Sequence, residues 1–421
     1  MQKTIHAANL ATEVVARCKK LAGFSEDAGT TRRTFLSPPM RGCHAEITKW
    51  LRAVGAEVHL DAAGNLHGYY AGVPSTAPRL LLGSHLDTVP NAGAYDGVLG
   101  VVLAVALLET LAGRRLPFGI EVIGFSEEEG VRFSVPFIGS RALVGRLDAE
   151  LLSCRDKNGV SVQEAIEGFG LKPTEIPRAL LRDDCLGYLE FHIEQGPVLE
   201  SLDRPLAAVD AIVGQYRLEF TFFGQANHAG TTPMHLRHDA LAGAAEWIAI
   251  VENLAKRTAG LVATVGFIEA TPGVANVIAG DVRAILDLRH ASNTACSQAL
   301  EELIRAAEII AAKRSLTFLR KTLLAQRAVV MDAFLVDQIA QAICQAGCEP
   351  HRMASGAGHD AMILAEKVPA AMIFLRTPGG ISHDPGESVQ LQDVASALEC
   401  GMRLLEQLAA SREFLTRSLR A

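Results

Sequence analysis

Four apolar segments of the chain run directly into side chains that can carry chemistry, and this pattern constrains the fold most. The segments are RLLLGSHLDT, GIEVIGFSEEE, GYLEFHIEQGP and AAMIFLRTPGGISH, which begin at residues 79, 119, 187 and 370. An apolar helix is expected after Asp96, so the first two segments read as a βαβ-like unit. In open α/β sheets the ligand site lies beyond the carboxyl ends of the strands. The sequence therefore predicts an α/β fold in which four distant segments meet at one site.

The stretch from about residue 214 to 324 follows a different order. Strand, helix, strand, hairpin, helix and strand succeed one another, which is close to the βαββαβ, or split-βαβ, unit. A chain of 421 residues is also long enough for two domains. His383 follows this stretch, but it belongs to the fourth apolar segment and must reach the site where the four segments meet. We therefore expect a discontinuous catalytic domain of residues 1–212 and 330–421. A smaller α+β domain of residues 213–329 should be inserted into it.

Charge and hydropathy exclude several classes of partner. The formal net charge is −7 and no basic stripe is present, whereas nucleic-acid binding normally needs one. The longest apolar run, Val98 to Leu108, is far shorter than the roughly 20 residues that span a bilayer. The N-terminal residues lack the apolar stretch of a signal peptide, and the eight cysteines form no CxxC motif. We expect a cytoplasmic protein with no nucleic-acid or membrane partner.

A strand-end HxD motif, formed by His85 and Asp87, is followed closely by Asp96. Alternation along an extended strand places His85 and Asp87 on the same side. A metal-binding histidine usually donates its second ring N–H to an acceptor, and Asp87 is placed to be that acceptor. The same motif also fits a purely structural pair, so it needs support from elsewhere in the chain.

That support comes from three consecutive acids, Glu127, Glu128 and Glu129, which follow a strand that should be buried. A run of charges is usually solvated, but clustered carboxylates beside a core repel one another unless cations compensate them. Either His192 or His383 alone would more often be a core residue. Together, the imidazoles and carboxylates favour a hydrolytic site for two divalent cations with a general base beside it.

Six motifs spread from about residue 79 to 390 extend this interpretation: GSHLDTVPNAGAYDGVLGV, FSEEEGVRF, HIEQGPVLE, NHAGTTPM, SGAGHDA and GGISHDP. Together they resemble the hydantoinase/carbamoylase branch of the M20 metallopeptidase-like amidohydrolases. That branch includes allantoate amidohydrolase, N-carbamoyl-L-amino-acid hydrolase and β-ureidopropionase. The resemblance implies a zinc-peptidase-like catalytic domain with a mixed central sheet and an inserted domain for dimerisation or lid closure.

The resemblance also implies a role for each matching residue. Asp96 would bridge two metals, with His85 and His192 completing one coordination shell and Glu129 and His383 the other. In the Glu-Glu-Gly pattern the base precedes the ligand, so Glu128 would be the general base and Glu127 an extra acid. Asp87 would orient His85. The family's substrate-binding positions match Gln195, His228, Asn276, Arg289 and Gly358.

The implied reaction is hydrolysis of a ureido or carbamoyl C–N bond in a small carboxylate substrate, with release of ammonia and carbon dioxide. Two divalent metal ions per subunit are expected, and the ligand types suit Zn, Mn, Co or Ni. Arg289 would hold the substrate carboxylate with its forked guanidinium, and His228 would stabilise the oxyanion. The resemblance further implies a homodimer in which His228 reaches across to the partner's site while Asn276 and Arg289 stay on their own side.

The motifs leave the substrate open. GQYR at 214–217 and NHAGTTPM look most like allantoate amidohydrolase, whereas FLRTPGGISHDP departs from the form associated with allantoate-specific members. Within FLRTPGGISHDP, Arg376 could bind an acidic substrate or could be a surface residue. The expected order is allantoate, then N-carbamoyl-L-amino acids, then a β-ureido acid. A dipeptidase or deacylase of the wider group and a non-catalytic binding protein are the alternatives, and the filled ligand positions disfavour the latter.

Overall fold

The computed structural model describes residues 2–417, with side chains from Asn9 onward. The chain divides into two compact units. The larger unit contains the residues up to Asp210 together with those from Met331 onward, and the smaller one contains Ala211–Val330. These boundaries lie within two residues of the division expected from the sequence.

The larger unit is built on a mixed sheet whose strands run in the order β1-β2-β4-β3-β5-β15-β6, with β14 beside β6. The strands are β1 (Glu57–Leu60), β2 (Leu66–Tyr70), β3 (Arg79–His85), β4 (Gly119–Phe125), β5 (Cys185–Ile193), β6 (Leu206–Ile212), β14 (Arg352–Ser355) and β15 (Ala370–Leu375). The short β13 (Val329–Val330) pairs with the end of β6. The predicted α/β class with a mixed central sheet is confirmed.

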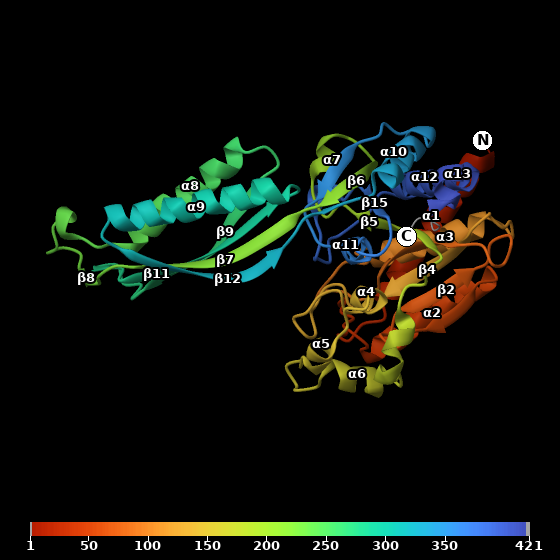
Figure 1. Cartoon of the computed structure of the whole chain (residues 1–421), viewed down its shortest axis with the longest axis horizontal. Coiled ribbons are helices and arrows are strands. Elements are labelled where there is room, and N and C mark those ends of the chain that lie inside the picture. The colour runs from red at the N-terminus through yellow and green to blue at the C-terminus, as the bar shows by residue number, and fades with distance from the viewer. Residues whose placement is uncertain (1, 418–421) are drawn as a thin grey trace. The chain divides into compact units, whose positions relative to one another are not determined.

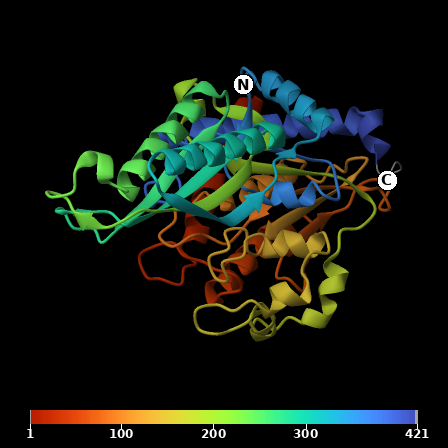
Figure 2. The same ribbon diagram turned by 60° about the vertical axis from the view of Figure 1, so that its left-hand side comes forward.

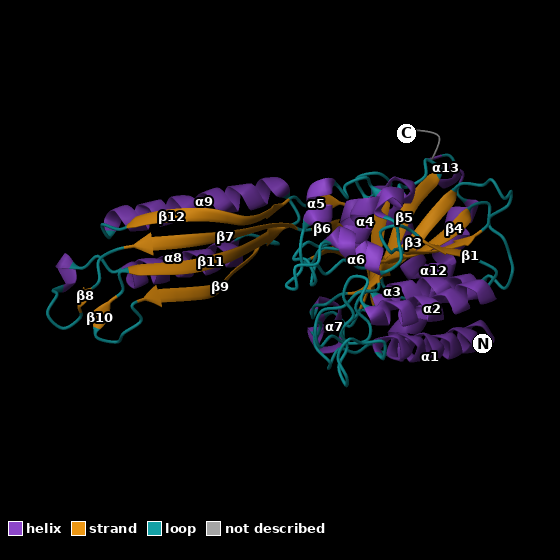
Figure 3. Ribbon diagram, turned by 90° about the horizontal axis from the view of Figure 1, so that it is seen from below, coloured by secondary structure: helices purple, strands orange, loops and turns teal. Residues whose placement is uncertain are grey.

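Helices α2, α3 and α12 pack against the sheet, and α1 packs on α3 and α12 on the same side (Figure 3). The helices of the unit are α1 (Gln2–Ala22), α2 (Pro38–Ala53), α3 (Val98–Thr110), α4 (Ile138–Leu143), α5 (Ala149–Ser153), α6 (Val162–Gly168), α7 (Val198–Ser201), α10 (Ala333–Gln345), α11 (Asp360–Leu364), α12 (Leu391–Ala410) and α13 (Arg412–Leu415), with 3-10 turns η1 (Pro173–Ala179) and η3 (Pro378–Gly380). Every residue from Val98 to Leu108 of α3 is buried, which explains why this helix is apolar on all sides. No helix in the described part of the chain is long and apolar enough to cross a membrane.

Four neighbouring strands of the sheet are the four apolar segments that the sequence singles out. β4, β3, β5 and β15 are adjacent, and each pairs in parallel with the next. Strands buried on both faces read as continuous apolar runs, and every residue of β4, β5 and β15 is buried. Because parallel strands end at the same edge, the residues that follow them are brought together, as predicted.

The smaller unit is a four-stranded antiparallel sheet with two helices on one face. Its strands run in the order β12-β7-β11-β9, and α8 and α9 lie side by side against them (Figures 1 and 2). The elements are β7 (Gly214–Phe223), β8 (Asn227–His228), η2 (Met234–Leu236), α8 (Ala240–Arg257), β9 (Val262–Thr271), β10 (Val277–Ile278), β11 (Asp281–His290), α9 (Asn293–Lys313) and β12 (Thr317–Gln326). The main elements follow the expected βαββαβ order. Phe220, Phe222 and Trp247 are fully buried between the sheet and the helices.

Candidate metal centre and active site

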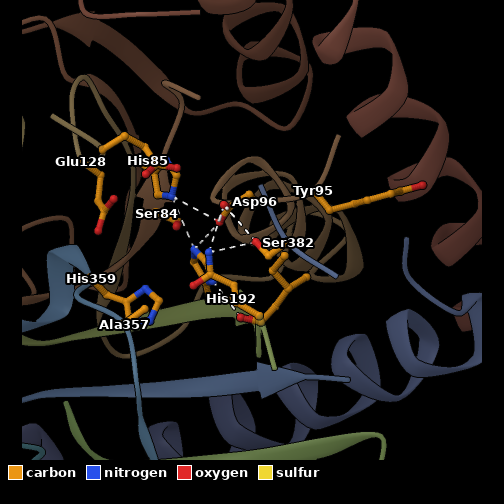
Figure 4. A network of polar contacts seen from close by, with 12 residues as sticks. Ser84, His85, Tyr95, Asp96, Glu128, His192, Ala357, His359 and Ser382 are labelled. Atoms are coloured by element: carbon orange, nitrogen blue, oxygen red, sulfur yellow. Dashed lines mark hydrogen bonds and ion pairs between the residues drawn. The ribbon is translucent and has the colours of Figure 1, made fainter. Parts of the chain in front are cut away.

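Two buried histidine rings face each other at the carboxyl edge of the sheet. His85 ends β3, His192 lies in β5, and their Nε2 atoms are 3.4 Å apart (Figure 4). The Nδ1 atom of His85 lies 3.0 Å from the carbonyl oxygen of Asp87, and that of His192 lies 2.9 Å from the carbonyl oxygen of Ile193. A carbonyl only accepts, so each Nδ1 carries a proton, and in the neutral ring each Nε2 keeps its lone pair. Both rings therefore present a metal-binding nitrogen to the same point.

Asp96 directs its two carboxylate oxygens toward two different groups of side chains. Oδ1 lies 3.2 Å from His192 Nε2 and 3.7 Å from His85 Nε2, whereas Oδ2 lies 3.1 Å from His383 Nε2. The Oδ1 atom is buried and has no hydrogen-bond partner among the described residues, which is costly for a carboxylate unless a cation satisfies it. Gly97 has a φ of +65°, and a Cβ there would lie 2.4 Å from the His85 ring. The turn that presents Asp96 therefore needs glycine.

Glu129 and His383 lie on the Oδ2 side of Asp96. Glu129 Oε1 is 3.5 Å from His383 Nε2, and the His383 side chain is 49% exposed. Within the described residues, the possible ligand atoms of His85, Asp96 and His192 lie within 4.8 Å of one another, as do those of Asp96, Glu129 and His383. The two groups share Asp96. The donor set and the unsatisfied Asp96 oxygen fit a pair of divalent cations bridged by one carboxylate.

Glu128 lies beside these groups, close to His85 (Figure 4). Burial raises the pKa of Glu128 well above its usual value, and the nearby Glu129 and Asp360 raise it further. Burial together with the charge of Asp96 raises the pKa of Glu129 to about 7. These carboxylates destabilise one another's charged forms at neutral pH. Bound cations would relieve that repulsion.

Asp87 contributes to the site differently from the sequence expectation. Its carboxylate accepts the backbone N–H groups of Glu128 and Glu129, at 2.9 and 3.0 Å. The nearer acceptor for His85 Nδ1 is the Asp87 carbonyl, while the Asp87 carboxylate lies 3.5 Å away. Asp87 thus contacts His85 and also binds the backbone that carries Glu128 and Glu129. Alternation along a strand did not reveal this second contact.

Gln195 borders the metal groups from the end of β5. Its φ is +60°, its backbone N–H donates to Thr377 Oγ1 at 3.0 Å, and its Nε2 lies 3.0 Å from Asp96 Oδ2. Gly358 lies just before α11, and a Cβ there would lie 2.9 Å from the ring of Phe137. Gly358 is therefore tightly packed, and the partly exposed Gln195 is within reach of the candidate metal ligands.

Several buried polar residues at this edge were not anticipated. Glu190 accepts hydrogen bonds from Ser84 Oγ at 2.8 Å and from the backbone N–H of Ala361 at 3.0 Å. The His359 ring packs 4.4 Å from that of His192, and its Nε2 lies 2.8 Å from Ser355 Oγ. The possible ligand atoms of Glu190, His192 and His359 also lie within 4.8 Å of one another, but Glu190 and His359 already have these hydrogen-bond partners. Glu190 and His192 are two residues apart in LEFHIE, so they lie on the same face of the strand, and this spacing could have revealed Glu190.

In the smaller unit, His228 is held in one tautomer by its own loop. Its Nδ1 accepts the backbone N–H groups of Gly230 at 3.0 Å and Thr231 at 3.2 Å. Because Nδ1 accepts, the neutral ring carries its proton on Nε2 and can donate there. The carbonyl oxygen of Asn276 accepts the N–H of Ala229 at 2.9 Å, so Asn276 and His228 sit together in the β8–β10 ribbon.

Arg289 lies at the opposite end of this sheet, so a transfer of His228 to a partner subunit would carry Asn276 with it, whereas the sequence expectation kept Asn276 on the side of Arg289. β10 leads directly into β11, and Arg289 is eight residues beyond Asp281, or about 26 Å along the strand. The turn after β9 carries Asn276 to the His228 end, which is why residue order was misleading. Arg289 is itself paired within its unit, with Nε 2.7 Å from Asp287 Oδ1. A salt bridge within the unit is the alternative to binding a substrate carboxylate, and this pair is such a salt bridge.

Arg376 and Glu127 have structural partners. Arg376 Nε and NH2 each lie 2.8 Å from the Asp393 carboxylate, NH1 lies 2.8 Å from Asp203, and the side chain is 13% exposed. Its guanidinium is therefore engaged by two carboxylates of its own unit. Glu127 is fully buried and accepts the backbone N–H of Arg132 at 3.1 Å, which holds the loop after Glu128 and Glu129.

Comparison with known proteins agrees with this arrangement. The model of peptidase family M20/M25/M40 matches residues 81–410. An N-carbamoyl-L-amino acid amidohydrolase from Geobacillus stearothermophilus is 39% identical over 92% of this chain and 95% of its own length. An allantoate deiminase from Arabidopsis thaliana is 38% identical over 96% of this chain and 83% of its own length.

A solved structure of an amidase of the hydantoinase/carbamoylase family from Burkholderia multivorans has a TM-score of 0.89 and 28% identity. It covers 95% of this chain and 98% of that chain. The family match spans most of the chain, and relatives that act on C–N bonds match nearly all of it. The chain belongs to peptidase family M20/M25/M40, in its hydantoinase/carbamoylase branch, and is a hydrolase that acts on C–N bonds.

Proposed function

We propose that the protein hydrolyses the ureido or carbamoyl C–N bond of a small N-carbamoyl-type acid with the help of two divalent cations. The observation that carries this proposal is the placement of Asp96 between two groups of side chains, one at each carboxylate oxygen. Glu128, buried beside both groups, supplies a base. Allantoate is the first candidate substrate, because the GQYR and NHAGTTPM motifs resemble those of allantoate amidohydrolase.

N-carbamoyl-L-amino acids are the second candidate. The relative from Geobacillus stearothermophilus named for that substrate is 39% identical, against 38% for the Arabidopsis allantoate deiminase. Overall identity therefore does not separate the two. A β-ureido acid is the third candidate, and a dipeptide or acylated amino acid is a more distant alternative within the same family.

In the proposed mechanism His85 and His192 would hold one cation, Glu129 and His383 would hold the other, and Asp96 would contribute a carboxylate oxygen to each. When bound, the cations supply Lewis acidity that lets water lose a proton near neutral pH. Glu128 accepts that proton and delivers it to the leaving nitrogen. The Nε2–H of His228 donates to the carbonyl oxygen as that oxygen becomes negative. Addition of water to R–NH–CO–NH2 then yields R–NH2, carbon dioxide and ammonia, so atoms and charge balance.

A panel of substrates tests the reaction class. With metal-loaded protein, ammonia release should be measured for allantoate, several N-carbamoyl-L-amino acids and a β-ureido acid, and the release of free amino acids should be measured for dipeptides. We expect turnover of at least one ureido acid and none of the dipeptides. Preferred hydrolysis of dipeptides would refute the ureido assignment, and no hydrolysis of any compound by fully loaded protein would favour a binding function.

The substrate carboxylate should contribute to recognition through Arg289. Because Arg289 is already paired with Asp287, an amidated substrate loses a charge-assisted hydrogen bond without leaving the guanidinium bare. Such a bond contributes about 1.5–3 kcal/mol, so kcat/KM for the amide should fall roughly 10- to 100-fold. Arg289→Gln should remove most of the preference for the acid, whereas equal turnover of acid and amide by the unaltered protein would contradict this role.

We further propose a homodimer formed through the smaller unit. β9 and β12 are the edge strands of its sheet, and Val262, Ile268 and Leu319 on them are 60%, 48% and 65% exposed. Free, apolar sheet edges are usually covered, and two-fold pairing is the commonest solution. Near His228, Met234 and Leu236 are 76% and 59% exposed. In this proposal His228 and Asn276 complete the active site of the partner subunit.

A further inference from the structure

One buried carboxylate, that of Glu387, connects the segment that carries His383 to the loop that carries Asp96. Glu387 is 5% exposed, and its Oε1 accepts the backbone N–H of Tyr95 at 2.8 Å and that of Asp96 at 3.1 Å. One oxygen thus binds two consecutive peptide groups, and the second belongs to Asp96 itself. The position of the Asp96 main chain is therefore tied to a residue almost 300 positions later in the sequence.

The packing around Glu387 leaves this clamp little freedom. A Cβ at Gly93 would lie 2.4 Å from both the Cβ and the Oε1 of Glu387, so the loop before Asp96 rests directly on the Glu387 side chain. Ser382 Oγ lies 3.5 Å from Glu387 Oε2 and 3.5 Å from Asp96 Oδ2. Glu387 therefore contacts the Asp96 loop through its backbone and approaches the Asp96 carboxylate through Ser382.

We propose that Glu387 is a positioning residue that holds Asp96 with one carboxylate oxygen toward each group of metal ligands. This inference rests on the proposed two-metal function. Glu387 follows His383 by four residues, so the same segment sets the place of a ligand and of the bridging carboxylate. The arrangement parallels that of Asp87, whose carboxylate takes the N–H groups of Glu128 and Glu129. Two carboxylates, each binding two backbone amides, thereby fix three of the candidate ligand and base residues.

Two substitutions separate the hydrogen-bond acceptor from the charge. Glu387→Gln keeps an oxygen that can accept both amides, whereas Glu387→Met keeps the length of the side chain and removes the acceptor. The affinity for Zn²⁺ or Mn²⁺ should be measured by competition with a chelator of known affinity, and the unfolding temperature by melting the metal-free protein. Loss of a residue that orients a ligand typically weakens metal binding 10- to 100-fold. We expect that loss for Glu387→Met and near wild-type affinity for Glu387→Gln.

Asp61 offers a matched control. It is 8% exposed, and its Oδ1 accepts the N–H groups of Ala63 at 2.9 Å and Asn65 at 2.8 Å, in a loop without any proposed ligand. Asp61→Leu should lower the unfolding temperature of the metal-free protein and leave the metal affinity of the folded protein unchanged. An equal loss of metal affinity in this variant would mean that general loosening, not positioning, explains the effect of Glu387.

Wild-type metal affinity in Glu387→Met, or an equal loss in Glu387→Gln, would overturn the proposal that the two amides are held through this acceptor. If Glu387→Met does not fold, Glu387→Asp, which keeps the charge but withdraws the oxygen, takes its place with the same expected loss. Failure of the wild-type protein to bind any divalent cation would instead refute the proposed function itself.

Discussion

Glu128→Gln is expected to abolish turnover while the protein keeps its metal ions. Glutamine has nearly the shape of glutamate but cannot accept a proton from water, and general-base catalysis typically contributes about 10²- to 10⁴-fold. The substitution also leaves untouched the backbone N–H of residue 128, which Asp87 binds at 2.9 Å. Ammonia release and elemental metal analysis of the same preparation check both halves of the prediction.

Glu129→Gln is the matched comparison, because it alters the neighbouring carboxylate that faces His383. This variant should lose metal as well as activity. The opposite pattern, with metal lost from Glu128→Gln and both metal and activity kept in Glu129→Gln, would show that base and ligand have been assigned one residue out of register.

Mixing two inactive variants should restore activity if His228 acts on the partner's site. Glu128→Gln and His228→Ala proteins are unfolded, mixed in equal amounts and refolded, so that half of the dimers are hybrids. In each hybrid, the site that keeps Glu128 receives an intact His228 from its partner. Random pairing then restores up to about a quarter of the wild-type sites. Asn276→Ala should behave like His228→Ala in the mixture, because the two residues share the β8–β10 ribbon.

A mixture of Glu128→Gln with Glu129→Gln provides the control, since both residues follow β4 in one unit and no hybrid site would be complete. This mixture should remain inactive. If hybrids with His228→Ala form and fold but show no activity, His228 acts within its own chain and the proposed exchange between subunits is wrong.

Local patterns in the sequence predicted the central part of the site. Strands buried on both faces are mostly apolar, so polar side chains at or directly after their ends mark the edge where neighbouring parallel strands end. β3, β4, β5 and β15 satisfy this condition, and their adjacency places His85, Glu129, His192 and His383 around Asp96. The order of strands and helices likewise predicted the βαββαβ unit, because that unit is defined by local alternation.

Contacts that depend on long-range loop packing were out of reach. The Asp87 carboxylate accepts the backbone N–H groups of Glu128 and Glu129, and the Glu387 carboxylate accepts that of Asp96. No periodic pattern in the sequence reveals either interaction. Arg376 looked available because its partner Asp393 is 17 residues away, in α12. The course of the turn after β9, which brings Asn276 beside the His228 loop and away from Arg289, likewise cannot be read from residue order.

Metal titration tests the central claim most directly. The protein is freed of metal with a chelator, dialysed, and supplied with Mn²⁺ or Zn²⁺ in steps while ammonia release from its best ureido substrate is followed. The bridging position of Asp96 predicts no activity without metal and a rate that rises until two equivalents per chain are bound, then stays constant. Full activity in the metal-free protein, or saturation at one equivalent, would contradict the two-metal site.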